Sequence, residues 1–77
     1  MTKYTVKQLK DMINEGVAID ISHADNAKRT EIEKEEEYYR QIGYASGVYG
    51  CNGMLLQGHK TGKLYAIAGR TQAIYIF

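Results

Sequence analysis

The sequence lacks several features that commonly stabilise or locate small proteins. Its 77 residues include one cysteine, Cys51, and no proline. A single cysteine cannot form an internal disulfide, which fits a reducing cytoplasm. No apolar run approaches the roughly 18 residues that a membrane helix needs, and the first ten residues lack the apolar stretch of a secretion signal. We therefore expect a cytoplasmic protein that contacts no membrane.

Metal ligands are also scarce. One cysteine and two scattered histidines do not supply four ligands at the spacing that structural zinc usually requires. At this length a folded chain buries only about 60% of the surface that its unfolded form exposes. The sequence thus predicts no metal and no cofactor, and a core thin enough that we expect self-association, for example as a homodimer. Because no repeat or proline- or serine-rich linker divides the chain, residues 1–77 are expected to form a single domain.

Charge is sorted along the chain. Residues 1–37 hold all nine acidic residues and six basic ones, for a net charge of −3, whereas residues 38–77 hold four basic residues and no acidic one. Seven of the eight glycines and six of the seven tyrosines also lie from residue 38 onward. Glycine and aromatic enrichment is typical of strands and turns. The first half therefore reads as mainly helical and acidic, and the second as a basic β-meander.

The first helix is clearly marked. Thr5 followed by Gln8 is a capping-box pattern, an apolar stripe follows, and Gly16 is a natural helix stop. Residues 17–21 (VAIDI) read as a strand or an extended connector. Ser22 is expected to cap a second, mostly solvated helix over residues 23–37.

The second half alternates with a period of two. Strands are predicted over residues 38–45, 54–58, 63–68 and 73–77, with turns at Ser46-Gly47 and Asn52-Gly53 and a loop over residues 59–62. The predicted fold is α+β: one or two N-terminal helices packed on a C-terminal antiparallel sheet of about four strands. The first helix is expected to cover one face of that sheet.

Two catalytic motifs come close but fail. Residues 58–63 (GHKTGK) resemble a phosphate-binding loop, but only three residues separate the glycines and Leu64 follows the lysine. Cys51 with His23 or His59 and Asp20 would supply a nucleophile, a base and an orienting group, yet no local signature accompanies the cysteine. We therefore expect no catalytic residues and a protein that is not an enzyme.

Two sets of residues are candidates for binding a partner. Glu35, Glu36 and Glu37 end an acidic run that either mimics nucleic-acid phosphates or is a solvated helix end. Tyrosines and cations of the second half suit a protein interface, a nucleic-acid surface, or simply a tyrosine-rich core. The candidates in this second set are Tyr44, Tyr49, Lys60, Lys63 and Arg70.

Two segments carry a resemblance to known proteins: TVKQLKDMINEGVAIDIS (residues 5–22) and IGYASGVYGCNGMLLQGHKTGKLYAI (residues 42–67). The chain resembles a group of short, uncharacterised proteins of Gram-positive bacteria and their mobile elements. The resemblance implies a setting in which small non-enzymatic proteins of phages and plasmids bind a host protein, as anti-CRISPR and other anti-defence inhibitors do.

The leading hypothesis is therefore a small non-enzymatic protein that occupies a surface of another protein, such as an inhibitor of a host defence nuclease. The alternative is a small nucleic-acid-binding module that uses Arg40, Lys60, Lys63 and Arg70 on a tyrosine-rich sheet. In a third hypothesis, the acidic half of one copy meets the basic half of another to form a homodimer.

Overall fold

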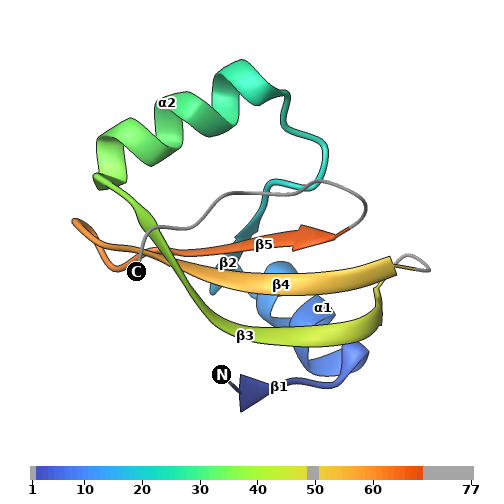
Figure 1. Ribbon diagram of the computed structural model, residues 1–77. Helices are drawn as coiled ribbons and strands as arrows, with labels where there is room; N and C mark the ends of the chain where they lie inside the picture. The colour runs from blue at the N-terminus through green and yellow to red at the C-terminus, as the bar shows by residue number, and fades with distance from the viewer. Residues whose placement is uncertain (1, 49–50, 69–77) are drawn as a thin grey trace.

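A computed structural model describes residues 2–48 and 51–68 of the chain. Two helices and five strands make an α+β fold, as predicted (Figure 1). In chain order the elements are β1 (Thr2–Lys3), α1 (Val6–Asn14), β2 (Ala18–Asp20), α2 (Asn26–Glu36), β3 (Tyr39–Val48), β4 (Cys51–Gly58) and β5 (Leu64–Ala68). Within these described residues, neither helix is long and apolar enough to cross a membrane.

The five strands form one mixed sheet in the order β1-β3-β4-β5-β2. Strands β3, β4 and β5 make the predicted antiparallel meander, but β1 lies parallel to β3 and β2 parallel to β5. The prediction of an antiparallel sheet of about four strands was therefore wrong in strand number and in direction. Strands β1 and β2 have only two and three residues, which is too short for an alternating pattern of apolar and polar residues to predict them. Their partner strands also lie more than 40 residues away in the chain. The strand predicted over residues 73–77 lies outside the described residues.

Helix α1 begins as the sequence predicts. The Thr5 hydroxyl accepts a hydrogen bond from the Gln8 backbone N–H at 3.1 Å, and the Gln8 side chain accepts one from the Thr5 N–H at 2.9 Å. Two backbone donors that a helix start leaves unpaired are satisfied in this way. The helix ends before Gly16, which has a φ of +77° and so adopts a conformation that glycine takes without strain.

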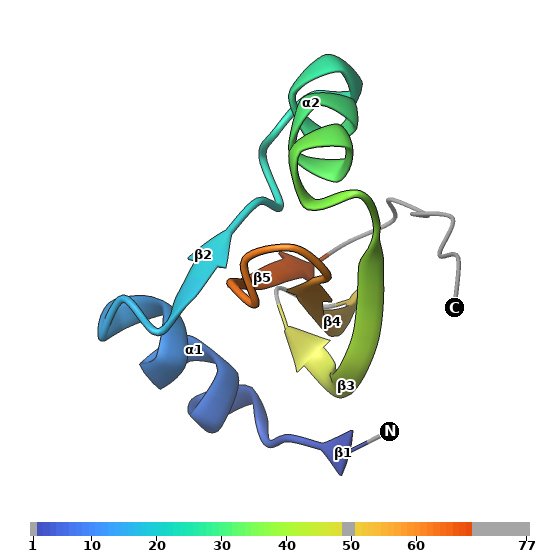
Figure 2. The ribbon, with the colours of Figure 1, turned by 90° about the vertical axis from the view of Figure 1, so that its left-hand side faces the viewer.

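The two helices lie on opposite faces of the sheet (Figure 2). Successive residues of a strand point to opposite faces. Leu55 accordingly packs in the cluster with Leu9 of α1, and Leu56 packs in the cluster with Ile32 of α2. The expectation that one face is covered by the first helix was thus incomplete, because α2 buries Ile32 and Glu36 against the other face.

Helix α2 begins three residues later than predicted. Its N-cap is Asp25, whose carboxylate accepts a hydrogen bond from the Lys28 N–H at 2.8 Å. The predicted cap, Ser22, lies in a turn after β2, where its N–H donates to the Asp20 carboxylate at 2.9 Å. An aspartate can accept a hydrogen bond from the backbone N–H two residues later, which favours this local turn over a helix start.

Ser46-Gly47 and Asn52-Gly53 were predicted as turns but lie inside β3 and β4. Gly47 has a φ of +84° and sits where the β3–β4 register shifts between Ala45 and Val48. The positive φ therefore serves a bulge in a strand rather than a turn between strands.

Candidate functional site

Residues 58–63 join β4 to β5, beginning with the last residue of β4, and are called the loop here. All six of their backbone N–H groups donate hydrogen bonds to acceptors within the protein. Three of them bond within the loop: Gly58 to the Lys63 carbonyl at 2.9 Å, Gly62 to the Gly58 carbonyl at 3.1 Å and Lys63 to the Thr61 hydroxyl at 3.2 Å. The other three donate to the end of α2 and the residues that follow it. The N–H of His59 donates to the Tyr38 carbonyl, that of Lys60 to the Glu36 carbonyl and that of Thr61 to the Glu36 carboxylate. No amide is left to hold a phosphate, so this loop lacks the essential feature of a phosphate-binding loop.

The buried Glu36 carboxylate holds this loop through Thr61. It is 2% exposed, and it accepts hydrogen bonds from the backbone N–H of Thr61, at 3.2 Å, and from the Thr61 hydroxyl. It lies directly over Gly58, where a Cβ atom would stand 1.6 Å from the Glu36 Oε2. A buried charge is costly unless hydrogen bonds compensate it, and here a hydroxyl and an amide do so. Glu36 therefore fixes the loop to the end of α2.

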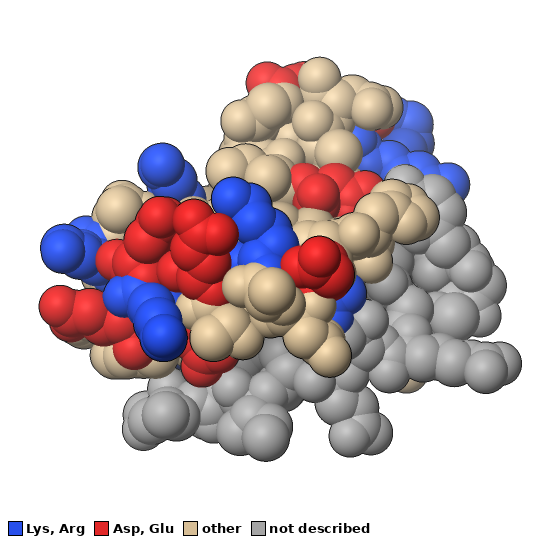
Figure 3. All heavy atoms as spheres, turned by 90° about the horizontal axis from the view of Figure 1, so that it is seen from above, with Lys and Arg blue, Asp and Glu red and all other residues tan. Residues whose placement is uncertain are grey.

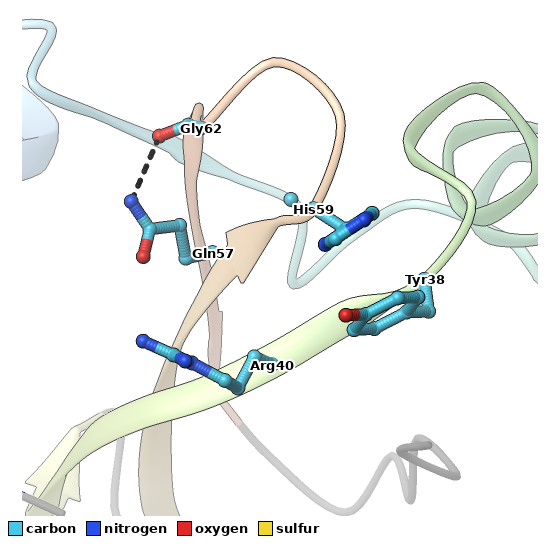
Figure 4. Close-up of a pocket in the computed structure, with 6 residues that line it drawn as sticks. Tyr38, Arg40, Gln57, His59 and Gly62 are labelled. Carbon is cyan, nitrogen blue, oxygen red and sulfur yellow. Dashed lines mark hydrogen bonds between the residues drawn. The ribbon is translucent and has the colours of Figure 1, made fainter. Parts of the chain in front are cut away.

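Beside this fastened loop lies an open depression of about 220 Å³ (Figure 4). Its walls come from the start of β3, the end of β4 and the loop, and consist of Tyr38, Arg40, Gln57, Gly58, His59 and Gly62. Arg40 and Gln57, 17 positions apart in the chain, thus meet because the β3–β4 hairpin brings the two strand ends together.

Arg40 and Gln57 form one wall of the depression. Their Cα atoms are partners across β3 and β4, so their side chains project side by side from the same face. This face is opposite to that of Tyr39 and Leu56, which pack under α2. The Gln57 amide donates to the Gly62 carbonyl at 3.4 Å, which holds the side chain toward the loop (Figure 4). A guanidinium and a primary amide therefore stand side by side on this face, and the amide is held by the loop.

Tyr38 and His59 form the opposite wall. Their rings stack with centroids 4.3 Å apart and planes inclined by 18°. The hydrogen bond from the His59 N–H to the Tyr38 carbonyl, at 3.0 Å, fixes the backbones of the same pair. Both aromatic rings are therefore held in place without a ligand.

The buried tyrosines belong to the core. Tyr39 and Tyr65 pack edge to face beneath α2, with centroids 5.5 Å apart. Burial raises the pKa of both phenols above their ordinary value, and nearby Glu36 adds to the increase. The Tyr39 hydroxyl donates to the Arg29 carbonyl at 3.5 Å. These two residues stabilise the fold and offer no surface to a partner.

The structure separates the predicted binding residues. Glu35 and Glu37 are exposed at the end of α2, whereas Glu36 is buried and was wrongly grouped with them as a surface residue. Its burial follows from its position four residues after Ile32, on the inner side of the helix. Lys60 and Lys63 are exposed on the loop that borders the depression. These four exposed residues thus surround the place where α2 and the loop meet.

Tyr44 lies elsewhere. It is 36% exposed and lines a second depression of about 410 Å³, together with Gln41, Ser46, Asn52, Gly53 and Met54. The remaining predicted residues, Tyr49 and Arg70, lie outside the described residues. The described part of the chain therefore does not gather Tyr44 with the lysines into one surface.

Helix α2 does not present a continuous acidic surface. Seen from the side on which α2 lies, acidic and basic side chains are interspersed (Figure 3). Lys28 and Lys34 are exposed on the helix along with Glu31 and Glu35, and the Lys28 ammonium lies 3.9 Å from the Glu31 carboxylate. Alternating signs of this kind weaken the negative field that a mimic of nucleic-acid phosphates would need.

The catalytic arrangement considered for Cys51 is not assembled with His59. Cys51 begins β4 and His59 follows its last residue, so about 25 Å of strand separates them. Asp20 already accepts the Ser22 N–H. In the described residues, no three His, Cys, Asp or Glu side chains come together where a metal ion could bind.

Sequence reasoning missed the depression, although one signal was available. The sequence suggested Arg40 for the nucleic-acid-binding module and His59 as a possible base for Cys51, but it suggested no role in a site for Gln57 or Tyr38. Tyr38 and Arg40 lie two apart on one strand, which places them on the same face. Nothing in the sequence gives the register that sets Gln57 beside Arg40.

Comparison with known proteins found no matching family model, and neither a curated protein nor a solved structure matches the chain.

Proposed function

We propose that this protein is a small non-catalytic binding protein of the cytoplasm, which acts by occupying a surface of another protein. The observation that carries the proposal is the polar depression with Tyr38, Arg40 and His59 on its walls and two exposed lysines on its rim. Tyrosine and arginine are enriched at the centres of protein interfaces. The Glu36 contacts and the aromatic stack hold this surface ready, so little conformational entropy is lost when a partner docks.

The mixed charge around the depression favours a protein partner over a nucleic acid. Arg40, Lys60 and Lys63 are exposed, but Glu35 and Glu37 are exposed at the helix end against which the same loop packs. A phosphate backbone on the lysines would meet these carboxylates and the negative end of the helix dipole. A protein surface carries both signs and can complement both.

A narrower form of the proposal, inhibition of a host defence nuclease, rests on the resemblance described above. In that form Glu35 and Glu37 enter a nucleic-acid groove of the nuclease while the depression docks beside it. Replacing both residues with lysine should abolish inhibition in a cleavage assay and leave the unfolding midpoint nearly unchanged. Full inhibition by the double variant would remove the mimicry part and leave protein binding in place.

The docking proposal is tested by partner capture with matched variants. Tagged wild-type protein, Arg40→Ala, His59→Ala and Lys28→Ala are compared in lysate from the native host, with chemical cross-linking and mass spectrometry of the captured band. Lys28 is the control because it is exposed at the opposite end of α2 from the loop. We expect one cross-linked partner that is lost with Arg40→Ala and His59→Ala and kept with Lys28→Ala. Equal capture by all four would refute docking at the depression.

Two companion measurements address the alternatives. A gel shift at low salt with single- and double-stranded oligonucleotides tests the nucleic-acid-binding module, whose complex should weaken steeply as salt rises. Sedimentation at two salt concentrations tests homodimer formation through the oppositely charged halves, because salt weakens attraction between exposed charges. A salt-stable monomer would exclude that charge-driven dimer.

A further inference from the structure

The depression is built from side-chain donors alone. Its polar wall consists of the Arg40 guanidinium and the Gln57 amide, while the backbone amides of the neighbouring loop are all used internally. Sites for phosphate groups commonly rely on backbone N–H groups that converge on the tetrahedral anion. None converges here.

A planar anion suits these donors better. Guanidinium is a rigid, always charged fork that matches the two oxygens of a carboxylate. The Gln57 side chain stands beside Arg40 across the two strands, but its nitrogen donates to the Gly62 carbonyl and its oxygen lies on the Arg40 side in Figure 4. The Arg40 guanidinium therefore supplies the fork for a planar anion by itself.

The aromatic wall completes a pocket for a side chain. The stacked rings of Tyr38 and His59 stand across from Arg40 in Figure 4, and Gly58 and Gly62 also line the depression. A glutamate or aspartate side chain would place its methylene groups against the rings and its carboxylate on the Arg40 guanidinium. The exposed Lys60 and Lys63 would attract further acidic residues of the segment, whereas Glu35 and Glu37 at the end of α2 would repel any that approach them.

From this geometry we infer that the depression is a carboxylate-recognition site, which takes an aspartate or glutamate side chain from an acidic segment of the partner protein. The inference rests on the proposed function and adds the chemistry of the partner. Arg40 binds the carboxylate, and the Tyr38–His59 stack forms the opposite wall.

The test uses the full-length protein and defined probes. An acetylated, amidated decapeptide of alternating glutamate and glycine is titrated against ¹⁵N-labelled protein, and NMR follows the Gln57 side-chain amide and the Arg40 Nε–H resonance. The probes for comparison are the same peptide with glutamine in place of glutamate, inorganic phosphate, and a decameric oligothymidylate. We expect saturable shifts with the glutamate peptide in the millimolar range and none with the glutamine peptide.

Variants separate recognition of the planar group from simple attraction of charge. Arg40→Ala should weaken binding of the glutamate peptide about tenfold or more, the effect of losing a hydrogen-bonded charge. Arg40→Lys keeps the charge but loses the fork, and should also bind several-fold more weakly. Lys28→Ala should bind like the wild type. Proton–nitrogen spectra of each variant confirm that the fold is retained.

Three other outcomes of the titration would overturn the inference. Equal shifts with the glutamine peptide mean that the carboxylate is not recognised, and shifts with phosphate or oligothymidylate alone assign the site to those ligands. If no probe shifts the two resonances, the depression binds no carboxylate. In the last case the capture experiment still decides the proposed function, because loss of the partner with Arg40→Ala would retain docking at this surface without an acidic segment.

Discussion

Glu36 determines the shape of the candidate site although it does not line the depression. Its carboxylate and its carbonyl together accept hydrogen bonds from Lys60 and Thr61, and so hold the loop that borders the depression. Among the described residues, the donors to this carboxylate are the neutral N–H and hydroxyl of Thr61. Its stability in the interior therefore depends on the Thr61 hydroxyl and amide.

Thr61→Val tests this dependence. Valine has the shape of threonine but no hydroxyl, so the buried Glu36 carboxylate loses a donor and the Lys63 N–H loses its acceptor. We expect the free energy of unfolding to fall by about 1–3 kcal/mol. Thr61→Ser retains the hydroxyl and should lose less than about 1 kcal/mol. Urea denaturation measures both, and equal values for valine and serine would contradict the role assigned to the hydroxyl.

Tyr39 is expected to make the fold sensitive to alkaline pH. Because burial raises the pKa of its phenol, the folded protein keeps the proton at pH values where the unfolded chain releases it. The stabilisation is complete below the ordinary tyrosine pKa of about 10 and is lost as the pH rises above it. Melting temperatures measured from pH 8 to 11 should fall less steeply for Tyr39→Phe than for the wild type. The control is Tyr44→Phe at an exposed phenol, and identical slopes for Tyr39→Phe and the wild type would refute the prediction.

At the scale of elements, α2 and β4 approach each other so closely that no side chain fits between them at Gly58. Gly58 in β4 lies under the Glu36 carboxylate of α2, and a similar close approach joins Gly43 of β3 to the Tyr4 ring.

The two edge strands of the sheet, β1 and β2, differ in the side chains that they expose. The edge strand β1 exposes Lys3, which discourages pairing with another sheet, whereas β2 exposes Ile19, which is 48% accessible.

Gly58→Ala should separate α2 from β4. Its Cβ would stand 1.6 Å from the Glu36 Oε2, so the carboxylate or the helix end must move. We expect a loss of about 2 kcal/mol or more in the free energy of unfolding. In a double-mutant cycle with Glu36→Ala, the alanine at position 58 should cost much less, because the clash is gone. Additive effects would show that the two positions are not coupled.

At the scale of the whole molecule, the sheet order places β4 at the centre. Leu55 and Leu56 of β4 are fully buried, one on each face, and the chain's long-range pairings converge on this strand and its neighbours. The edges are held by few bonds, such as the Tyr4 N–H to the Tyr44 carbonyl and the Ile21 N–H to the Ala66 carbonyl, both 2.8 Å.

Hydrogen exchange should be slower in the central strand β4 than in the residues beside the edge strands. Amides of Leu55 and Leu56 are expected to exchange last, at the free energy of global unfolding, and those of Tyr4 and Ile21 earlier through local opening. Native-state exchange measured by NMR across low denaturant concentrations distinguishes the two classes. Equal protection at all four amides would mean that the edges open only with the whole fold.

The sequence predicted those features that depend on neighbouring residues. The Thr5–Gln8 capping box, the Gly16 helix stop and the meander of β3, β4 and β5 all follow from local patterns. Features that depend on distant pairing were missed, namely the parallel edge strands and the register that joins Arg40 to Gln57.

The acidic run illustrates the limit most clearly. Composition treats Glu35, Glu36 and Glu37 alike, but helical spacing from Ile32 turns only Glu36 inward. Its burial depends on Gly58 and Thr61, which are more than 20 residues away, and no local pattern identifies them.

The parallel edges also have a consequence for synthesis of the chain. Strand β2 is complete at Asp20 but pairs with residues that end at Ala66, so 46 further residues must be added before its hydrogen bonds can form. At ribosomal rates of roughly 5–20 residues per second this delay lasts about 2–9 s. Until these residues are added, the aliphatic side chains of β2 cannot pack into the sheet and are accessible to nascent-chain chaperones.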